Sequence, residues 1–377
     1  MQSSGATPPG AVAAPDLAEV ARATGPFASI YVVTESGIDN AAHRNELRWK
    51  TLRSELAEAG VEEDVLAEVD PHLAQAHLAG PGLAIIATAG GVLHIDHGVE
   101  APTTDRAVWA ALPELVPIIR WRQAAPPYMT VLADRLGADI TVVRQEGHEI
   151  QTEAGGVTDD PIAKSAPGGW SQRRFQNRAE NSWAENAEDV AEQIASLARA
   201  HGVRLIVAAG DVREMQLIRD AMPDEILELL EVVEGGRSED GSEEQYQHAV
   251  AQHVTGLVNL DGERILAKFR EEVGQDDRAT NGPAATMRAL TMAQVDTLLI
   301  EDDPDDDRAA WFGSEPNMVA YGPEALRAMG DDEPQEGRLV DILVRAALGT
   351  GAAVRVLPKG SELDGGVGAL LRWADAE

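Results

Sequence analysis

The sequence predicts an α/β protein in which mixed sheets are covered by helices. Short apolar runs of strand type, such as Leu83–Thr88, Val203–Ala209 and Val295–Ile300, alternate along the chain with charged segments of helical periodicity. With 44% apolar residues in 377, the chain has enough apolar side chains for packed cores, and its length favours two to three domains.

The N-terminal part of the sequence predicts a short tail followed by an α/β domain. Residues 1–16 are small and Pro-rich, without the basic and apolar stretches of a secretory signal, and are expected to be a disordered tail. Residues 17–125 are expected to form the first domain, with a buried strand at Phe27–Thr34 and a charged helix at Asn40–Ala59. The segment Arg120–Pro127 ends in two prolines, which disfavour a helix, and is expected to link this domain to the next.

Residues 126–257 are expected to form a middle domain built on a sheet. Strands are predicted at Tyr128–Asp134 and Asp139–Arg144, and a loop containing Pro-Gly-Gly comes after them. The loop is followed by one helical face that is sustained for roughly six turns. The apolar side chains of that face are Phe175, Ala179, Trp183, Ala187, Val190, Ile194 and Leu197.

Residues 258–377 are expected to form a third, C-terminal α/β domain. Helices are predicted at Glu263–Val273 and Leu339–Leu348, and a strand is predicted at Ala352–Leu357. A separate helix at Glu243–Val258 is expected to close the middle domain, so the sequence predicts a helix break at the domain boundary.

One short stretch differs in charge from the rest of the chain. The whole chain has a formal charge of −33, yet Lys164–Arg178 holds four cations and no carboxylate, so everything outside it sums to −37 (−33 minus 4). A positive loop on an acidic protein favours a polyanionic partner. The Gly168–Gly169 pair allows close backbone approach, and a helix predicted to begin near Gln172 would add its N-terminal dipole for phosphate. The alternative is a simple surface turn followed by a solvated helix face.

The same stretch carries a family resemblance. Gly168-Gly169-Trp170-Ser171-Gln172-Arg173-Arg174-Phe175, followed by a long amphipathic helix and the strand Leu205–Gly210, resembles the middle domain of the archaeo-eukaryotic class-one release factors. It is most similar to their bacterial branch, which includes mycobacterial relatives and the ribosome hibernation factor Balon. The closing segment Gly365–Trp373 resembles the last strand of that family, and Gly25–Tyr31 resembles its opening strand more weakly.

This resemblance implies a three-domain, release-factor-like architecture whose C-terminal domain docks a translational GTPase. It also implies a site in the loop. Trp170 stands where the family has its catalytic Gln, and Gln172, two residues later, is the candidate catalytic residue for hydrolysis of peptidyl-tRNA. Two residues along a helix rotate a side chain by roughly 200°, which favours RNA binding over catalysis. The candidate RNA-binding residues are Lys164, Gly168, Gly169, Trp170, Ser171, Arg173, Arg174 and Arg178.

Each of these residues also has a structural interpretation. Trp170 either stacks on a nucleotide base or packs the loop onto its own domain. Arg173, Arg174 and Arg178 either bind phosphates or pair with carboxylates along their own helix.

The family's decoding motifs, an Asn-Ile-Lys-Ser loop and a Tyr-x-Cys-x-x-x-Phe motif, are missing from this sequence. The resemblance therefore implies a hibernation factor that occupies the ribosomal A site without decoding stop codons. It would contact ribosomal RNA and be held there by elongation factor Tu with GTP. One alternative is a peptidyl-tRNA hydrolase or rescue factor that uses Gln172. A second is a stress-induced interaction protein with no ribosomal role.

Composition excludes several other classes. The chain has no cysteine, so it forms no disulfide or thiolate metal site, and this fits a reducing cytoplasm. No apolar run is long enough for a membrane span, and the acidity argues against specific DNA binding. We expect no cofactor and no metal: His94-Ile95-Asp96-His97 is predicted to be a surface turn, and Glu301–Asp307 a solvated acidic loop. A phosphate-binding loop of the GxxxxGK type is absent, so any GTPase would be a partner.

Overall fold

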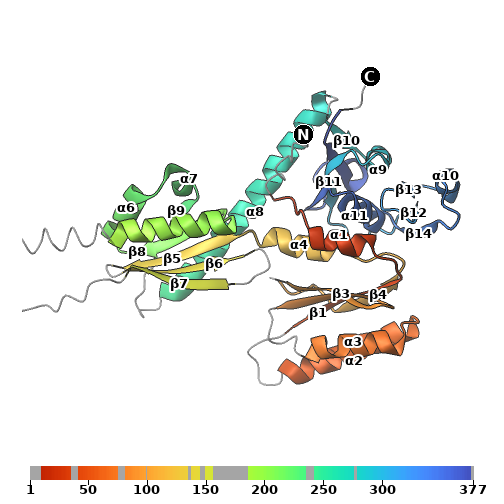
Figure 1. Ribbon diagram of the computed structural model, residues 1–377, viewed down its shortest axis with the longest axis horizontal. Helices are drawn as coiled ribbons and strands as arrows, with labels where there is room; N and C mark the ends of the chain where they lie inside the picture. The colour runs from red at the N-terminus through yellow and green to blue at the C-terminus, as the bar shows by residue number, and fades with distance from the viewer. Residues whose placement is uncertain are drawn as a thin grey trace, which may run out of the picture. The chain divides into compact units, whose positions relative to one another are not determined.

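A computed structural model describes residues 10–34, 41–74, 81–98, 100–134, 137–144, 149–155, 186–234, 242–275 and 278–374 (Figure 1). The chain forms two compact units. Residues 1–124 and 260–377 together make the first, and residues 125–259 make the second. Both units consist of sheets covered by helices, so the predicted mixed α/β class is confirmed.

The N-terminal part of the first unit is a four-stranded antiparallel sheet of order β3-β2-β1-β4. Side chains of β1 alternate between its two faces, with Ile30 and Val32 on one face and Phe27 and Tyr31 on the other, and all four are buried. One face packs on helices α2 and α3. The bounds are β1 Phe27–Val33, β2 Gly82–Thr88, β3 Gly91–Gly98, β4 Arg106–Ala110, α2 Ala41–Glu58 and α3 Glu63–Ala74.

The C-terminal part of the first unit has a second four-stranded sheet, of order β10-β16-β11-β15, in which only β11 and β15 are parallel. A small sheet of order β13-β12-β14 lies beside helices α9, α10 and α11. The bounds are β10 Ala279–Asn281, α9 Pro283–Thr291, β11 Val295–Glu301, β12 Ala309–Phe312, β13 Val319–Ala320, α10 Pro323–Ala328, β14 Gln335–Arg338, α11 Leu339–Gly349, β15 Ala353–Leu357, η2 Asp364–Gly366 and β16 Val367–Leu371.

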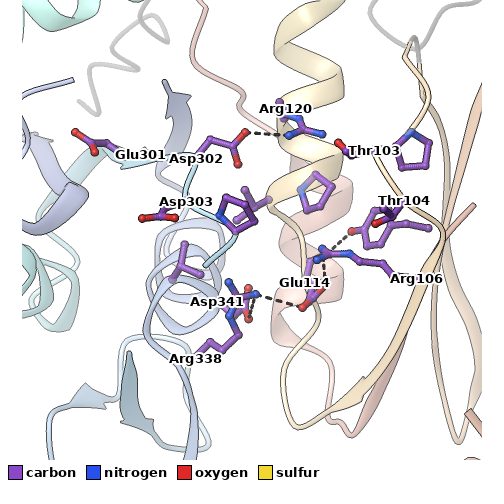
Figure 2. A pocket seen from close by; sticks show the side chains of 16 residues that line it. Thr103, Thr104, Arg106, Glu114, Arg120, Glu301, Asp302, Asp303, Arg338 and Asp341 are labelled. Atoms are coloured by element: carbon purple, nitrogen blue, oxygen red, sulfur yellow. Dashed lines mark hydrogen bonds and ion pairs between the residues drawn. The ribbon is translucent and has the colours of Figure 1, made fainter. Parts of the chain in front are cut away.

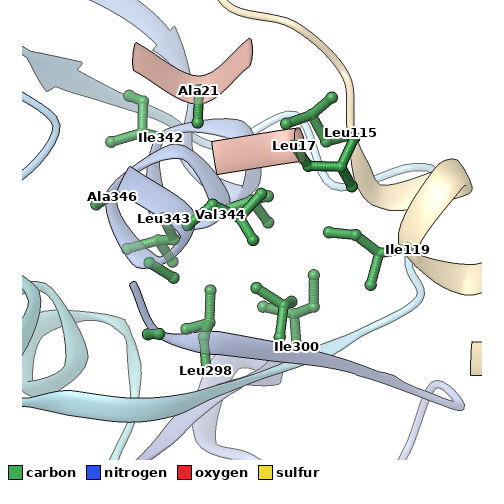
Figure 3. Close-up of a cluster of buried hydrophobic side chains, with 14 of the residues drawn as sticks. Leu17, Ala21, Leu115, Ile119, Leu298, Ile300, Ile342, Leu343, Val344 and Ala346 are labelled. Atoms are coloured by element: carbon green, nitrogen blue, oxygen red, sulfur yellow. The ribbon is translucent and has the colours of Figure 1, made fainter. Parts of the chain in front are cut away.

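The two ends of the chain share one hydrophobic core. Helix α1 (Pro15–Arg22) and helix α4 (Val116–Ala124) pack against α11, β11 and β15, and side chains from both ends belong to one buried cluster. Figure 3 shows Leu17 of α1 and Ile119 of α4 beside α11 and above Ile300 of β11. The sequence places these parts in two domains, whereas the structure gives them a common core because α1 and α4 lie between the two sheets.

The expectation of a disordered tail is wrong for residues 10–16. Val12 forms an antiparallel bridge with Val354, and Arg355 donates a hydrogen bond of 2.7 Å to the carbonyl oxygen of Gly10. Val12 is 2% exposed because it lies against the free edge of β15. Pro15 then opens α1, a position where the missing N–H of proline costs nothing.

The predicted linker at Arg120–Pro127 is also wrong in its first half. Residues up to Ala124 belong to α4, whose Trp121 is 2% exposed. Pro117 lies in the first turn of this helix, so it interrupts no intrahelical hydrogen bond. The change from one unit to the other takes place at Ala124 and Ala125, one residue before the two prolines.

The second unit is a five-stranded sheet of order β7-β6-β5-β8-β9, antiparallel from β7 to β5 and parallel from β5 to β9. A helix over residues 186–201 and helix α6 cover one face, and the first half of helix α8 covers the β5 and β8 part of the other face. The bounds are β5 Tyr128–Asp134, β6 Gly137–Val143, β7 Glu149–Gly155, β8 Leu205–Gly210, α6 Val212–Ala221, α7 Asp224–Leu227 and β9 Leu230–Val232.

Helix α8 (Ser242–Gln275) is one continuous helix of 34 residues, where the sequence predicts two helices with a break between them. The residues of the predicted break, Asn259-Leu260-Asp261-Gly262, have turn-like composition but contain no proline. Packing on both sides overrides this local preference. Tyr246 packs against β8, and Phe269 packs against β16, so the helix is anchored before and after the weak segment. None of the helices in the described ranges is both long and apolar enough to cross a membrane.

Candidate functional site

The basic stretch itself lies outside the described residues. This applies to the candidate catalytic residue Gln172 and to every candidate RNA-binding residue between Lys164 and Arg178. The structure describes the elements on either side of it. We use the word frame for the sheet of the second unit together with the helix over residues 186–201. The chain leaves the sheet at Gly155, the last residue of β7, and it is described again from Asn186, in the helix that covers the same sheet.

The frame is a well-packed layer. The helical face predicted from the sequence is confirmed where the structure describes it, because Ala187, Val190 and Ile194 are 1% exposed or less. They pack on Met129 and Val131 of β5, among the other side chains of one buried cluster. The described residues on either side of the basic stretch therefore belong to one packed layer.

The parallel strands of the frame approach each other closely at their carboxyl ends. A Cβ atom on Gly210, the last residue of β8, would lie 2.3 Å from the carbonyl oxygen of Ala133 in β5. Only glycine fits there. The next residue, Asp211, caps α6 by accepting a hydrogen bond of 3.0 Å from the backbone N–H of Arg213.

The strand before the basic stretch has an acidic exposed surface. Glu149, Gln151 and Glu153 of β7 are all exposed. Carboxylates repel the phosphates of RNA, so these strands disfavour RNA binding outside the loop. The exposed face of β7 therefore offers no favourable surface for RNA next to the basic stretch.

A charged cavity, which the sequence did not predict, lies in the first unit (Figure 2). Its volume is 330 Å³, near the lower limit for small-molecule sites. Its walls come from β4, α4, the segment after β11, and the junction of β14 and α11. The lining side chains are Tyr31, Pro102, Thr103, Thr104, Arg106, Glu114, Val116, Pro117, Arg120, Glu301, Asp302, Asp303, Pro304, Arg338, Val340 and Asp341.

Three arginines from different elements reach this cavity. Arg106 of β4 and Arg338 of β14 share one buried carboxylate, Glu114, at N–O distances of 2.6 and 3.2 Å. Arg120 of α4 pairs with Asp302 at 2.9 Å. Figure 2 shows the three side chains arriving from different sides. All three are about one-third exposed, so their guanidinium groups remain accessible.

Asp341 is a buried carboxyl group in the first turn of α11 and lines the same cavity. Its nearest cation is Arg338, at 3.7 Å, which is an ion-pair contact too long for a hydrogen bond. Burial, helped by the charge of Glu114 and opposed by those of Arg338 and Arg106, raises the pKa of Asp341 to about 7. The carboxyl of Asp341 is therefore partly protonated at neutral pH.

The segment His94-Ile95-Asp96-His97 is not the predicted surface turn, because it lies within β3. Arg122 of α4 contacts Asp96 at 2.7 Å and Asp16 of α1 at 2.6 Å, and His94 lies 3.3 Å from Asp96. The hydrogen bond from Arg122 lowers the pKa of Asp16. The sequence missed this ionic cluster because two of its members lie in segments assigned to a tail and a linker. Within the described ranges, no three His, Asp or Glu residues could hold a metal ion.

The acidic run Glu301–Asp307 is more ordered than the solvated loop that the sequence predicts. Glu301 accepts a hydrogen bond of 3.0 Å from the backbone N–H of Gly360. Asp303 pairs with Lys359 at 2.8 Å, and Asp306 pairs with Arg308 at 2.6 Å. Each pairing lowers the pKa of its aspartate. This run therefore forms one wall of the charged cavity.

Comparison with known proteins finds a family model that matches the segment containing the basic stretch. Residues 127–275, from just before β5 to the end of α8, match the family described as bacterial archaeo-eukaryotic release factor family 2. The match covers this segment and not the rest of the chain. The resemblance found in the sequence is thereby confirmed at the level of the family.

Relatives cover most of the chain at lower similarity. The uncharacterized protein Rv2629 of Mycobacterium tuberculosis is 26% identical over 358 residues, which is 93% of this chain and 94% of that protein. A ribosome-bound archaeal Pelota, described together with ABCE1, is 13% identical and covers 97% of this chain and 96% of its own, with a TM-score of 0.39. Dom34 of S. cerevisiae, described as a translation termination-like factor that interacts with Hbs1, is 9% identical over 94% and 98% of the two chains, with a TM-score of 0.39.

Proposed function

We propose that this protein is a cytoplasmic, ribosome-binding factor that occupies the A site of idle or stalled ribosomes. The observation that carries the proposal is the concentration of positive charge in Lys164–Arg178, on a chain that otherwise sums to −37. This stretch falls inside the segment that matches the release factor family. Its arginines and the start of its helix provide donors for ribosomal RNA phosphates.

The described frame supports this role in two ways. The described residues that flank the basic stretch belong to a packed sheet and helix, which gives the stretch a folded support. The exposed carboxylates of β7 oppose RNA contact along the strand. Binding would then be confined to the loop, as expected for one docking position and not for general RNA coating.

The proposal gives the C-terminal part of the chain a separate partner. The resemblance of the closing segment Gly365–Trp373 to the last strand of the release factors implies a docked GTPase. Elongation factor Tu with GTP is the expected one. It would deliver or hold the protein in the A site. Because the decoding motifs of the family are missing from this sequence, the factor acts without reading a stop codon.

The test is sedimentation of the purified protein with vacant ribosomes through a sucrose cushion, with and without elongation factor Tu and GTP. We expect stoichiometric, salt-sensitive pelleting. The double variant Arg173→Glu and Arg174→Glu is expected to remain in the supernatant, because it replaces two phosphate donors with repelling charges.

A matched control is available in the same unit. Arg199→Glu with Arg219→Glu makes the same change in net charge at two exposed positions on the covering helices. Among the described residues, the ion-pair partner of Arg199 is Glu225, which is exposed, so folding is expected to be preserved. Equal loss of pelleting in both double variants would reject the loop as the contact. No pelleting of the unaltered protein at modest salt would reject the ribosomal role.

A further inference from the structure

The cavity between Arg106, Arg120 and Arg338 is a site that the proposed ribosomal function does not use. We infer that it binds a small oxyanion, such as a phosphate group or a dicarboxylate, between these three guanidinium groups (Figure 2). The inference is independent of the ribosome.

Two of the three arginines use only part of their N–H groups in contacts within the protein. Among the described residues, the paired acceptor of Arg120 is Asp302, reached through Nη1 alone, so most of the five N–H groups of this arginine remain available. Arg106 contacts Glu114 through Nη2 and lies over the ring of Tyr31. Both can add a bound oxyanion to their present contacts.

The positive charge of the cavity lies on one side, because the lining also holds five carboxyl groups. Arg106 and Arg338 share the single carboxylate of Glu114, which leaves that group of three with a charge of +1. Asp302 is neutralised by Arg120. On the far wall, Glu301 is bonded to backbone N–H groups and Asp303 to Lys359. Glu301 keeps its negative charge, so the charges of the lining nearly balance, and the positive side is the one formed by Arg106 and Arg338.

Asp341 makes the affinity depend on pH. When the Asp341 carboxyl is ionised, it repels an oxyanion bound beside it. When the carboxyl is neutral, this repulsion is absent. The charged groups that face Asp341 are Arg338 from β14, Glu114 from the segment before α4 and Arg106 from β4. Burial raises the pKa of Asp341 to about 7, so anion affinity should fall as the pH rises through this value.

Size and shape limit the ligand class. The volume of 330 Å³ is small, and the one aromatic ring in the lining, that of Tyr31, is 1% exposed. A nucleotide base would therefore find no ring to stack on. A cation is disfavoured as well, since the acidic side chains of the lining are already paired, bonded to backbone or partly neutral. A small anion with several oxygen acceptors remains.

The test is isothermal titration of the full chain with sulfate, phosphate and malonate at constant ionic strength. Sulfate keeps its charge near neutral pH, and it therefore isolates the titration of the protein. We expect saturable binding with one site. Arg120→Gln should weaken it about tenfold or more, because it removes charge-assisted donors. Arg270→Gln is the control, since it breaks a comparable exposed pair with Glu362 outside the cavity.

The three probes also identify the source of the anion. Preference for sulfate and phosphate indicates a phosphoryl-type ligand, and preference for malonate indicates a dicarboxylate. Asp341→Asn should abolish the pH dependence of sulfate binding. No saturable binding up to millimolar concentrations, or equal affinity in Arg120→Gln and the unaltered protein, would overturn the inference. Neither result would affect the proposed ribosomal RNA contact, which rests on Lys164–Arg178.

Discussion

At the scale of single residues, Asp341 makes the stability of the fold depend on pH. Its carboxyl is buried in the first turn of α11, and burial raises its pKa from the ordinary 3.8 to about 7. The folded state therefore holds a proton that the unfolded state has released between these two pH values. The contribution of Asp341 to stability is fully present below about pH 4 and is lost as the pH rises through about 7.

The corresponding prediction compares Asp341→Asn with the unaltered protein. The variant cannot ionise at this position, so its free energy of unfolding should exceed that of the unaltered protein at pH 8. The difference should shrink toward pH 4. Its upper bound is about 4 kcal/mol, since each pKa unit corresponds to ~1.4 kcal/mol. Urea denaturation across this pH range measures it, and a constant difference at every pH would contradict the assignment.

Gln172 decides between the two ribosomal hypotheses. Gln172→Ala should leave the ribosome affinity within about fivefold of that of the unaltered protein if the loop only binds, because one neutral hydrogen bond contributes ~1 kcal/mol or less. A rescue enzyme would instead lose release of the peptide from peptidyl-tRNA. The measurement is peptide release from stalled ribosomes by both proteins. Release that requires Gln172 would replace the hibernation proposal with the enzymatic one.

At the scale of elements, buried strands could be predicted from the sequence, whereas segments that are ordered by distant contacts could not. The run Val295–Ile300 appears as β11, and Leu83–Thr88 appears as β2, each within one residue of the expected bounds. Such runs are buried on both faces and therefore have a clear signal in sequence. Segments decided by distant partners were missed. Val12 is ordered by Val354, and the helix over Trp121 is ordered by a core that includes the other end of the chain.

The charged cavity was missed for the same reason. Arg106 and Arg120 lie on consecutive elements, but Arg338 lies near the other end of the chain, and no local motif joins the three. The basic stretch, in contrast, could be found from the sequence because its four cations lie within one short segment, Lys164–Arg178. Sequence reasoning thus identified the contiguous candidate site, and only the fold could assemble the dispersed one.

Continuity of α8 gives a prediction at the same scale. Gly256 lies inside this helix with open space around the position of a Cβ atom. Gly256→Ala should therefore stabilise the protein by about 0.5–1 kcal/mol, as expected for a helix interior. Gly210→Ala is the opposite case, because its Cβ would meet the backbone of Ala133. Thermal denaturation of the two variants checks both signs, and destabilisation by Gly256→Ala would argue against a continuous helix.

At the scale of the whole molecule, charge segregation predicts how binding responds to salt. If the four cations of Lys164–Arg178 each neutralise one phosphate, the logarithm of the ribosome affinity should fall with the logarithm of salt concentration at a slope of about −3 to −4. Arg173→Gln should reduce that slope by about one. Free RNA should bind weakly, since the remaining chain is strongly acidic. Filter binding over a salt series measures the slope, and a slope near zero would contradict phosphate contact.

The division of the chain also determines the order in which it can fold during synthesis. Residues 125–259 form a continuous stretch, so this unit has its complete set of strands before the last third of the protein is made. The core of the first unit is completed later. It contains side chains of α1 and α4, but also those of β11 and α11, which are translated in the last third of the chain. A nascent chain that stops after α8 would therefore contain one complete unit, while the apolar side chains of α1 and α4 would still be exposed. We expect such a chain to need a chaperone until the C-terminal segment has been translated.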